Sequence, residues 1–275
     1  DHKACEKIIS DSRIAHVVFT GSVRGGQEVK KYIGTRFINA GLELGGKDPA
    51  YVRADADINH AIENLADGAL FNSGQSCCGI ERIYVDKKIY KEFIDGFKSI
   101  TENYNLNDPS KSDTNLGPVV RQSAADFIRT QMKEAESEGA KRLIEESKFT
   151  ISKEDNCYVC PQVMVDVNHN MRFMMEETFG PAVGIMPVND EEEAKNLMND
   201  SPYGLTASVW TKDTEFAKDF GKSIETGTFF MNRCDYLDPA LAWTGVKDTG
   251  IGCSLSTLAF DQFTRPQSFH IRKVI

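Results

Sequence analysis

Residues 71–79 read Phe71-Asn72-Ser73-Gly74-Gln75-Ser76-Cys77-Cys78-Gly79. Immediately upstream, apolar residues recur at positions i, i+3, i+4 and i+7 over 58–70, which predicts an amphipathic helix. Asp55 or Asp57 is a suitable N-cap for this helix. The segment Arg82-Ile83-Tyr84-Val85 predicts a strand. The quoted stretch therefore joins a helix to a strand and places Cys77 just past a Gly-Gln turn.

The same alternation of strand and helix extends in both directions from this stretch. Further strands are predicted at 16–20, 36–43, 50–52, 158–166, 182–188, 206–210, 227–231 and 269–275, and further helices at 3–10, 23–33, 87–103, 119–139, 190–199 and 213–224. Segments 104–118, 141–157 and 232–254 read as loops or irregular excursions. Repeated βα units favour an α/β fold with a doubly wound, mainly parallel sheet.

Composition narrows the class of protein. The 275 residues are 40% apolar and 27% charged, which is typical of globular proteins. A net charge of −9 with dispersed basic residues argues against nucleic acid or an anionic membrane as partner. The apolar runs are far shorter than a membrane span. No signal peptide is visible, and the first residue, Asp1, suggests a fragment or a trimmed product.

Seven cysteines in irregular spacing favour a reducing compartment such as the cytoplasm over a disulfide scaffold. Cys157 and Cys160 form a C-x-x-C pair, but the histidines that would complete a metal site are scattered. We interpret the pair as two thiols at a strand edge and predict no metal site.

Cys77 is the candidate nucleophile. A lone cysteine is usually an inert core residue, but Gly74 permits a tight turn here, and Gln75 and Ser76 are polar. Backbone N–H groups at such a turn would lower the pKa of the thiol and could hold an oxyanion. The neighbouring Cys78 is interpreted as a packing residue.

Glu43 is the candidate general base. It lies 34 residues upstream of Cys77, in the segment Leu42-Glu43-Leu44-Gly45-Gly46-Lys47-Asp48-Pro49. A carboxylate at the end of an apolar strand either finds a partner or has its pKa raised by burial. A raised pKa would suit a base that activates water. The alternative is an ordinary surface glutamate.

Two further segments suggest a nucleotide site. Residues 18–26, Val18-Phe19-Thr20-Gly21-Ser22-Val23-Arg24-Gly25-Gly26, predict a strand, a glycine turn and a helix start. Such a junction directs backbone N–H groups at a phosphate. Residues 175–181, Met175-Glu176-Glu177-Thr178-Phe179-Gly180-Pro181, carry acids that could hold ribose hydroxyls. Taken alone, each segment is more often a simple turn.

Together these segments resemble, in order and spacing, the signatures of the NAD(P)-dependent aldehyde dehydrogenase superfamily. Phe-Thr-Gly-Ser at 19–22 is similar to its phosphate-binding turn, and 42–47 to its glutamate signature. Residues 74–77 resemble its cysteine signature, and 176–181 its Glu-Glu-x-Phe-Gly-Pro motif. Residues 201–205 and 231–232 resemble further landmarks.

The resemblance implies roles for individual residues. Cys77 would attack an aldehyde to give a thiohemiacetal, hydride transfer to NAD or NADP would leave a thioester, and Glu43 would activate water. The cofactor would contact Ser22, with its turn shaped by Gly21 and Gly26. The remaining two predicted cofactor residues are Glu177, which would hold the nicotinamide ribose, and Phe179, which would pack beside it.

The resemblance also implies a division of the chain. Residues 1–43 would end the dinucleotide-binding domain, 44–247 would form the catalytic domain, and 248–275 would return to the cofactor side. An edge strand at 268–275 would pair subunits into a dimer or tetramer. Family members are about twice as long, so the asparagine of the oxyanion hole and the adenosine-ribose residues would lie upstream of Asp1.

One motif departs from the family pattern, so the resemblance does not indicate which aldehyde is the substrate. The usual Pro-Phe-Gly-Gly-x-Lys-x-Ser-Gly reads Ala242-Trp243-Thr244-Gly245-Val246-Lys247-Asp248-Thr249-Gly250. Two alternative functions remain at this point: a non-catalytic binding or structural relative on the same scaffold, including an inactive fragment, and a cofactor-free thioester hydrolase or acyltransferase that uses Cys77 and Glu43.

Overall fold

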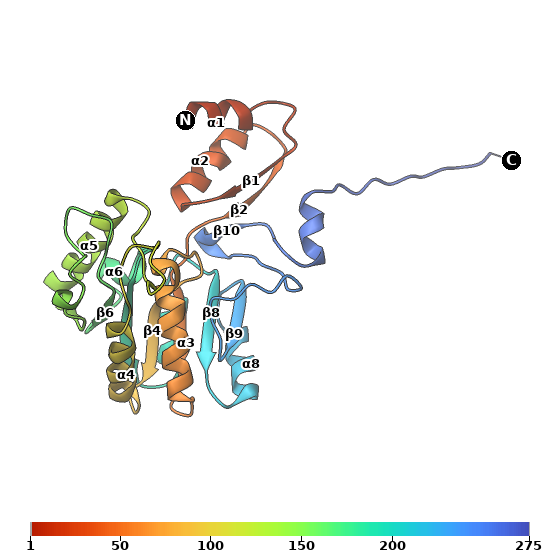
Figure 1. Cartoon of the computed structure of the whole chain (residues 1–275). Helices are drawn as coiled ribbons and strands as arrows, with labels where there is room; N and C mark the ends of the chain where they lie inside the picture. Colours follow the sequence, from red (N-terminus) through yellow and green to blue (C-terminus); the bar gives the residue numbers. More distant parts are fainter. Residues whose placement is uncertain (1, 275) are drawn as a thin grey trace.

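The computed structural model describes residues 2–274 and shows an α/β protein, as predicted, whose strands form two sheets (Figure 1). The strands are β1 (His16–Thr20), β2 (Asn39–Glu43), β3 (Asp48–Val52), β4 (Ile80–Asp86), β5 (Lys141–Arg142), β6 (Gln162–Val165), β7 (Ala182–Val188), β8 (Thr206–Trp210), β9 (Thr228–Met231) and β10 (Gly250–Ile251). The α-helices are α1 (His2–Ile9), α2 (Val23–Ile33), α3 (Ile58–Leu70), α4 (Tyr90–Glu102), α5 (Gln122–Ser137), α6 (Arg172–Met175), α7 (Glu191–Asn199) and α8 (Thr214–Lys222). Short 3-10 helices are η1 (Phe71–Gly74), η2 (Glu146–Lys148), η3 (Lys247–Thr249) and η4 (Thr257–Gln262).

The larger sheet has the strand order β5-β6-β7-β4-β3-β8-β9, and all its pairs are parallel except β5 with β6. Its central strands are buried on both faces. In β3, Ala50 and Val52 pack in the core formed with α3 and α4, whereas Tyr51 packs on the opposite side with α7 and α8. Side chains alternate across a strand, so this sheet is the middle of three layers and is doubly wound.

The smaller sheet has the order β1-β2-β10. β1 and β2 run parallel, and β10 joins β2 in the antiparallel direction. Its core contains Val29 and Ile33 of α2 and Leu42 of β2. The chain crosses to the larger sheet between Glu43 and Asp48 and returns near residue 250 (Figure 1). The domain boundaries given above remain predictions.

The predicted strand at 269–275 is wrong over the residues that the structure describes. After η4 the chain extends away from the body, and 269–274 belong to no strand (Figure 1); Ile275 lies outside the described residues. Phe269 is 77% exposed and Ile271 80%. Alternation marks a segment that can pair, but a strand also needs a neighbour, and none lies beside this tail within the described chain.

Other differences concern boundaries. The strand predicted at 36–43 begins at Asn39, and the one predicted at 158–166 is confined to β6, after Pro161. The predicted loop at 232–254 contains η3 and β10, and the irregular segment 141–157 contains β5 and η2. Cys157 and Cys160 are free thiols just ahead of β6. None of the helices within 2–274 combines the length and apolar character needed to cross a membrane.

Candidate active site

The turn that carries the candidate nucleophile is held in an unusual backbone conformation. Beyond α3, Asn72, Ser73 and Gly74 have positive φ angles of 50°, 59° and 69°. Glycine is required at the third position for a second reason, because an added Cβ would lie 2.1 Å from the carbonyl oxygen of Gly180. The turn therefore packs directly against the Gly-Pro end of the segment 175–181 and fixes the start of the residues that lead to Cys77.

The glycine pair after Glu43 brings the two candidate catalytic segments together. A Cβ added to Gly46 would lie 2.3 Å from the carbonyl oxygen of Cys77. Only a bare backbone allows this approach. The end of β2 and the residues before β4 are thus in direct backbone contact, although they are far apart in the sequence.

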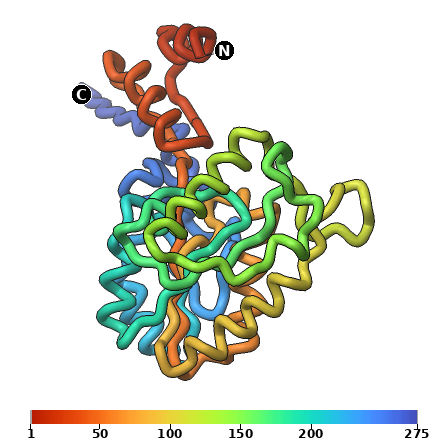
Figure 2. Tube along the Cα trace, turned by 90° about the vertical axis from the view of Figure 1, so that its left-hand side faces the viewer, coloured from red at the N-terminus to blue at the C-terminus, as the bar shows by residue number. Residues whose placement is uncertain are grey.

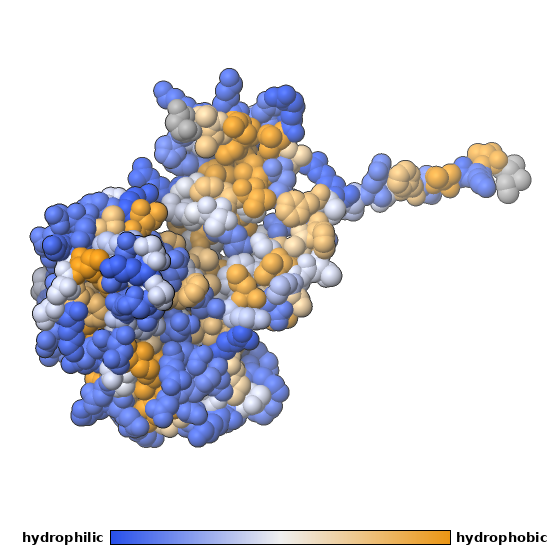
Figure 3. All heavy atoms as spheres, viewed as in Figure 1, coloured by the Kyte–Doolittle hydropathy of each residue, from blue (hydrophilic) through white to orange (hydrophobic). Residues whose placement is uncertain are grey.

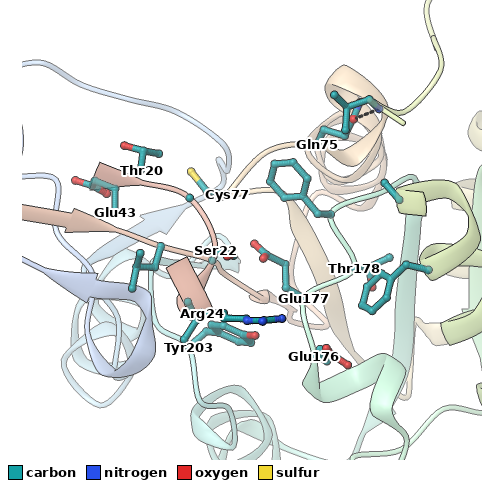
Figure 4. Close-up of a pocket in the computed structure, with 18 of the residues that line it drawn as sticks. Thr20, Ser22, Arg24, Glu43, Gln75, Cys77, Glu176, Glu177, Thr178 and Tyr203 are labelled. Atoms are coloured by element: carbon teal, nitrogen blue, oxygen red, sulfur yellow. Dashed lines mark hydrogen bonds between the residues drawn. The ribbon is translucent and has the colours of Figure 1, made fainter. Parts of the chain in front are cut away.

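A cavity of about 880 Å³ opens between the two sheets. Six of the seven predicted site residues line it: Gly21, Ser22, Glu43, Cys77, Glu177 and Phe179. Figure 4 shows the Cys77 side chain between Glu43 on one side and Glu177 on the other. The seventh residue, Gly26, lies inside α2, where an added Cβ would come within 2.6 Å of Leu44. Gly26 therefore allows α2 to pack closely on the strand segment rather than lining the cavity.

The thiol of Cys77 is partly exposed, and its pKa is lowered from the ordinary value for cysteine. The hydrogen bond with the side chain of Cys78 contributes most to this lowering of the pKa. Burial and the negative charges of Glu43 and Glu177 oppose it. Cys77 thus holds a larger share of thiolate at neutral pH than a free cysteine would, and the thiolate is the nucleophilic form.

Cys78 is buried, in agreement with its interpretation as a packing residue, and its neighbours include Leu205 and Trp243. Its sulfur also lies 2.8 Å from Asp235 Oδ1, so its single S–H can donate either to this carboxylate or to the Cys77 sulfur. The hydrogen bond with Cys77, then burial and the charge of Asp235, raise the pKa of Cys78. Of the two adjacent thiols, Cys77 is therefore the one that ionises first.

Glu43 ends β2 and has partners that the sequence did not indicate. The indole Nε1 of Trp243 donates to Glu43 Oε2 at 3.2 Å, and the hydroxyl of Ser254 donates to Oε1 at 2.6 Å. Trp243 and Ser254 also exchange two backbone hydrogen bonds with each other. The altered motif at 242–250 contains Trp243 where the family pattern has a phenylalanine, which could not donate, but nothing in the motif connects it with Glu43 or Ser254.

Glu177 lies across the cavity from Glu43. Its Oε1 accepts a 2.9 Å hydrogen bond from the backbone N–H of Gly46. Burial, followed by the negative charge of Glu81, raises the pKa of Glu177 to about 7, while the Gly46 N–H and Lys47 act in the opposite direction. This carboxyl group consequently changes its charge near neutral pH.

The turn after β1 forms the opposite wall of the cavity. Ser22 is the N-cap of α2 and accepts a hydrogen bond from Gly25 N at 3.2 Å. Its hydroxyl hydrogen remains able to donate. Gly21 N donates to the carbonyl oxygen of Glu43, which ties this turn to β2. Across residues 2–274, no three His, Cys, Asp or Glu side chains gather as a potential metal site.

Fold and cavity together define an α/β protein with a nucleotide-type βα turn facing a partly exposed cysteine. The comparison with protein families is specific: residues 1–269 match the aldehyde dehydrogenase family. The chain therefore belongs to the aldehyde dehydrogenase family.

Individual relatives agree with this assignment. The chain is 32% identical over 268 residues to succinate semialdehyde dehydrogenase [NAD(P)+] Sad of Escherichia coli, covering 98% of this chain and 57% of the relative. It is 34% identical over 277 residues to vanillin dehydrogenase of Corynebacterium glutamicum, covering 96% and 55%. It thus spans about half the length of the curated relatives it matches.

A solved structure shows the same architecture. The NADP-dependent glyceraldehyde-3-phosphate dehydrogenase from Bacillus halodurans, determined in complex with NADP, superimposes with a TM-score of 0.88 at 32% identity. The match covers 95% of this chain and 53% of that structure.

Proposed function

We propose that this chain forms the cysteine-bearing part of an NAD(P)-dependent aldehyde dehydrogenase, and that the whole protein oxidises an aldehyde to a carboxylic acid. The observation that carries the proposal is the shared cavity, which Cys77, Glu43 and Glu177 all line. Its volume of about 880 Å³ lies in the range of cofactor sites. The names of the relatives favour catalysis over a non-catalytic role.

The covalent step belongs to Cys77. Its thiolate attacks the aldehyde carbon, a C–S bond forms, and the carbonyl oxygen takes up a proton to give a thiohemiacetal. When bound, the nicotinamide cofactor supplies the acceptor for the hydride that leaves this carbon. The hydroxyl proton is released to water in the same step, so that a thioester remains on Cys77. The overall balance is aldehyde plus water plus oxidised cofactor to acid, reduced cofactor and a proton.

Glu43 serves the hydrolytic step. Its carboxylate takes a proton from water, the water oxygen attacks the thioester carbon, and the C–S bond breaks to release the acid and the Cys77 thiolate. A carboxylate has about four lone-pair sites. Trp243 and Ser254 occupy two of them, which leaves room for a water on the cavity side.

The cavity residues fit a dinucleotide. Ser22 and the first turn of α2 present N–H and hydroxyl donors suited to a pyrophosphate. Glu177 offers a carboxylate for ribose hydroxyls, and it lies so close to Gly45 that an added Cβ there would meet Oε2 at 2.5 Å. Phe179, 41% exposed, supplies an aromatic surface beside it. Both NAD and NADP remain candidates.

The remaining proposals concern the setting of the reaction. The substrate is a small-molecule aldehyde, with no nucleic acid or membrane partner. We infer a homodimer or homotetramer that pairs through the tail at 268–275, and a reducing compartment such as the cytoplasm.

The decisive experiment is to measure NADH or NADPH formation with a panel of aldehydes. Cys77→Ser is expected to lower kcat at least 10³-fold, because a hydroxyl at neutral pH is a far weaker nucleophile than a thiolate. Cys78→Ser should be much milder, since serine can still donate a hydrogen bond. Cys157→Ser is the matched control away from the cavity and should retain wild-type turnover.

Each alternative has its own outcome in this experiment. Full activity of Cys77→Ser would refute the assignment of the nucleophile. If Cys77 reacts with iodoacetamide no faster than Cys157 and no aldehyde is oxidised, the protein is a non-catalytic relative. Turnover of p-nitrophenyl acetate without any cofactor binding would instead identify a thioester hydrolase or acyltransferase.

A further inference from the structure

A buried ion pair lies directly behind the cavity. Lys47 Nζ and Glu81 Oε2 are 2.5 Å apart, with side-chain exposures of 0% and 5%. Lys47 also donates to the hydroxyl of Thr178 at 2.8 Å. Neither charged residue lines the cavity, and neither takes part in the reaction described above.

The Glu81 carboxylate is aimed at the backbone of the cavity wall. Oε2 accepts the N–H of Thr178 at 2.8 Å, and Oε1 accepts the N–H of Phe179 at 2.9 Å. One carboxylate therefore binds two consecutive backbone donors and one ammonium group. The two backbone donors, Thr178 and Phe179, are the residues that follow Glu177 in the sequence.

The backbone held by Glu81 is otherwise unfavourable. Phe179 has φ +49°, in the left-handed region that side chains with a Cβ avoid. The residue is also 41% exposed and lines the cavity. Strained residues persist where surrounding contacts over-determine them, and they gather at ligand sites. The two hydrogen bonds that Glu81 accepts from Thr178 N and Phe179 N supply such contacts.

Stability alone does not account for a charged pair in this position. Two apolar side chains of similar size usually stabilise a protein core at least as well as a buried ion pair does. What a buried, fully hydrogen-bonded pair adds is a defined geometry and a defined charge.

We propose that Glu81, held by Lys47, is a positioning residue for the cofactor site: it fixes the Thr178–Phe179 backbone and thereby sets the place and the charge of Glu177. The inference rests on the proposed function only in naming the ligand. It predicts that replacing Glu81 alters both cofactor binding and the ionisation of Glu177, although Glu81 itself does not touch the ligand.

Several charged groups face Glu177 from neighbouring elements. Glu81 on β4 raises its pKa, and Lys47, between the two sheets, lowers it with a smaller effect. Glu176 is paired with Arg172. Two further groups, Cys77 and Tyr203, lie close enough to respond to the charge of Glu177.

The sign of the pH effect follows from the raised pKa. Below about pH 7, Glu177 is mainly protonated, and above it the carboxylate is the better acceptor for ribose hydroxyls. NADH affinity should therefore rise about tenfold from pH 6 to pH 8. Glu81→Gln removes the negative charge of Glu81 and leaves the positive charge of Lys47, so the pKa of Glu177 should fall. The ratio of the NADH affinities at pH 8 and pH 6 should then shrink to less than about threefold.

Two readouts separate the role of Glu81 from the identity of the ligand. The first is the dissociation constant of NADH between pH 6 and 8.5, measured by fluorescence titration. The second is the alkylation rate of Cys77 by iodoacetamide, followed by peptide mass spectrometry, which needs no cofactor. The wild type should show an inflection near pH 7 from Glu177, and Glu81→Gln should move this inflection to lower pH.

Matched variants separate charge from position. Glu81→Asp keeps the charge on a shorter side chain, so the inflection should stay near pH 7 while NADH binds about tenfold more weakly. Gln162→Leu is the control, because Gln162 is equally buried, lies on β6, two strands away from Glu81 in the sheet, and donates from its side-chain amide to the carbonyl oxygen of Ile144. It should lower stability and leave both readouts unchanged.

If Glu81→Gln does not fold, the double variant Lys47→Met/Glu81→Leu replaces the pair by apolar residues. It should fold, bind NADH about tenfold more weakly and show its inflection below that of the wild type, since the charge of Glu81 outweighs that of Lys47. Wild-type inflections and NADH affinities in Glu81→Gln or in the double variant would overturn the inference. Failure of the wild type to bind NADH would instead refute the proposed cofactor, and the alkylation profile would still decide the role of Glu81.

Discussion

The two sheets differ in how fully they are buried. Every residue of β3, β4 and β8 in the larger sheet is buried, whereas β1 in the smaller sheet has no fully buried residue. Helix α1, beside the smaller sheet, has no buried residue. Helix α3, beside the larger sheet, has seven: Ala61, Ile62, Leu65, Ala66, Gly68, Ala69 and Leu70. In Figure 3 apolar side chains are visible on the surface around the smaller sheet, and Val18 of β1 is 59% exposed.

The candidate site lies where these unequal parts meet. Cys77 and Glu177 lie in loops that lead into strands of the larger sheet, and Ser22 lies in the turn after β1 of the smaller sheet. Glu43 is the last residue of β2, directly before the crossing. Figure 2 shows both chain ends on the same side of the molecule, at the end that carries the smaller sheet. We infer that the larger sheet supplies a rigid base for the chemistry and that the smaller sheet adjusts ligand binding.

The largest expected difference concerns stability. Ile83 in β4 is fully buried, so Ile83→Ala should lower the free energy of unfolding by about 2–5 kcal/mol through lost burial and a residual cavity. Val18→Ala in β1 should change it by less than about 0.5 kcal/mol, because the side chain is mostly exposed. Urea unfolding of both variants measures the two values. Equal losses would mean that the sheets contribute alike and would break the comparison.

The same contrast decided what the sequence could predict. Strands 16–20, 182–188 and 206–210 and helices 23–33 and 58–70 match the structure to the residue, because local periodicity specifies each of them. The tail at 269–275 failed because pairing depends on a neighbour. The residues of the cavity wall were predicted from local turns. The hydrogen bonds that Glu43 accepts from Trp243 and Ser254 were not predicted, nor was the one that Glu81 accepts from Phe179. These bonds join residues far apart in the sequence, and no local pattern indicates them.

The two tryptophans offer a matched test of the boundary between the sheets. Trp243 donates to Glu43, whereas Trp210 is buried in the larger sheet and donates to Ser208. Trp243→Phe removes one donor from the proposed base, so thioester hydrolysis should slow about tenfold, equivalent to about 1.4 kcal/mol. Pre-steady-state bursts of NADH would show the hydrolytic step as the slower one.

Trp210→Phe is the control for this experiment. It should lower the free energy of unfolding by about 1–2 kcal/mol and leave the rate of thioester hydrolysis unchanged. An equal slowing in both variants would assign the effect to general loosening of the fold. In that case the bond between Trp243 and Glu43 would have no role of its own.

The smallest expected effects concern two helix caps, one beside each sheet. Asp57 caps α3 by accepting from His60 N, and Ser22 caps α2 by accepting from Gly25 N. Replacing either residue by alanine removes one acceptor and should cost about 1 kcal/mol. For Asp57→Ala this loss should appear in global unfolding, because α3 is part of the main core. For Ser22→Ala it should appear as faster hydrogen exchange confined to α2, together with weaker NADH binding, since Ser22 also faces the cavity. Uniformly faster exchange throughout the chain in Ser22→Ala would show that the smaller sheet unfolds together with the larger one rather than before it.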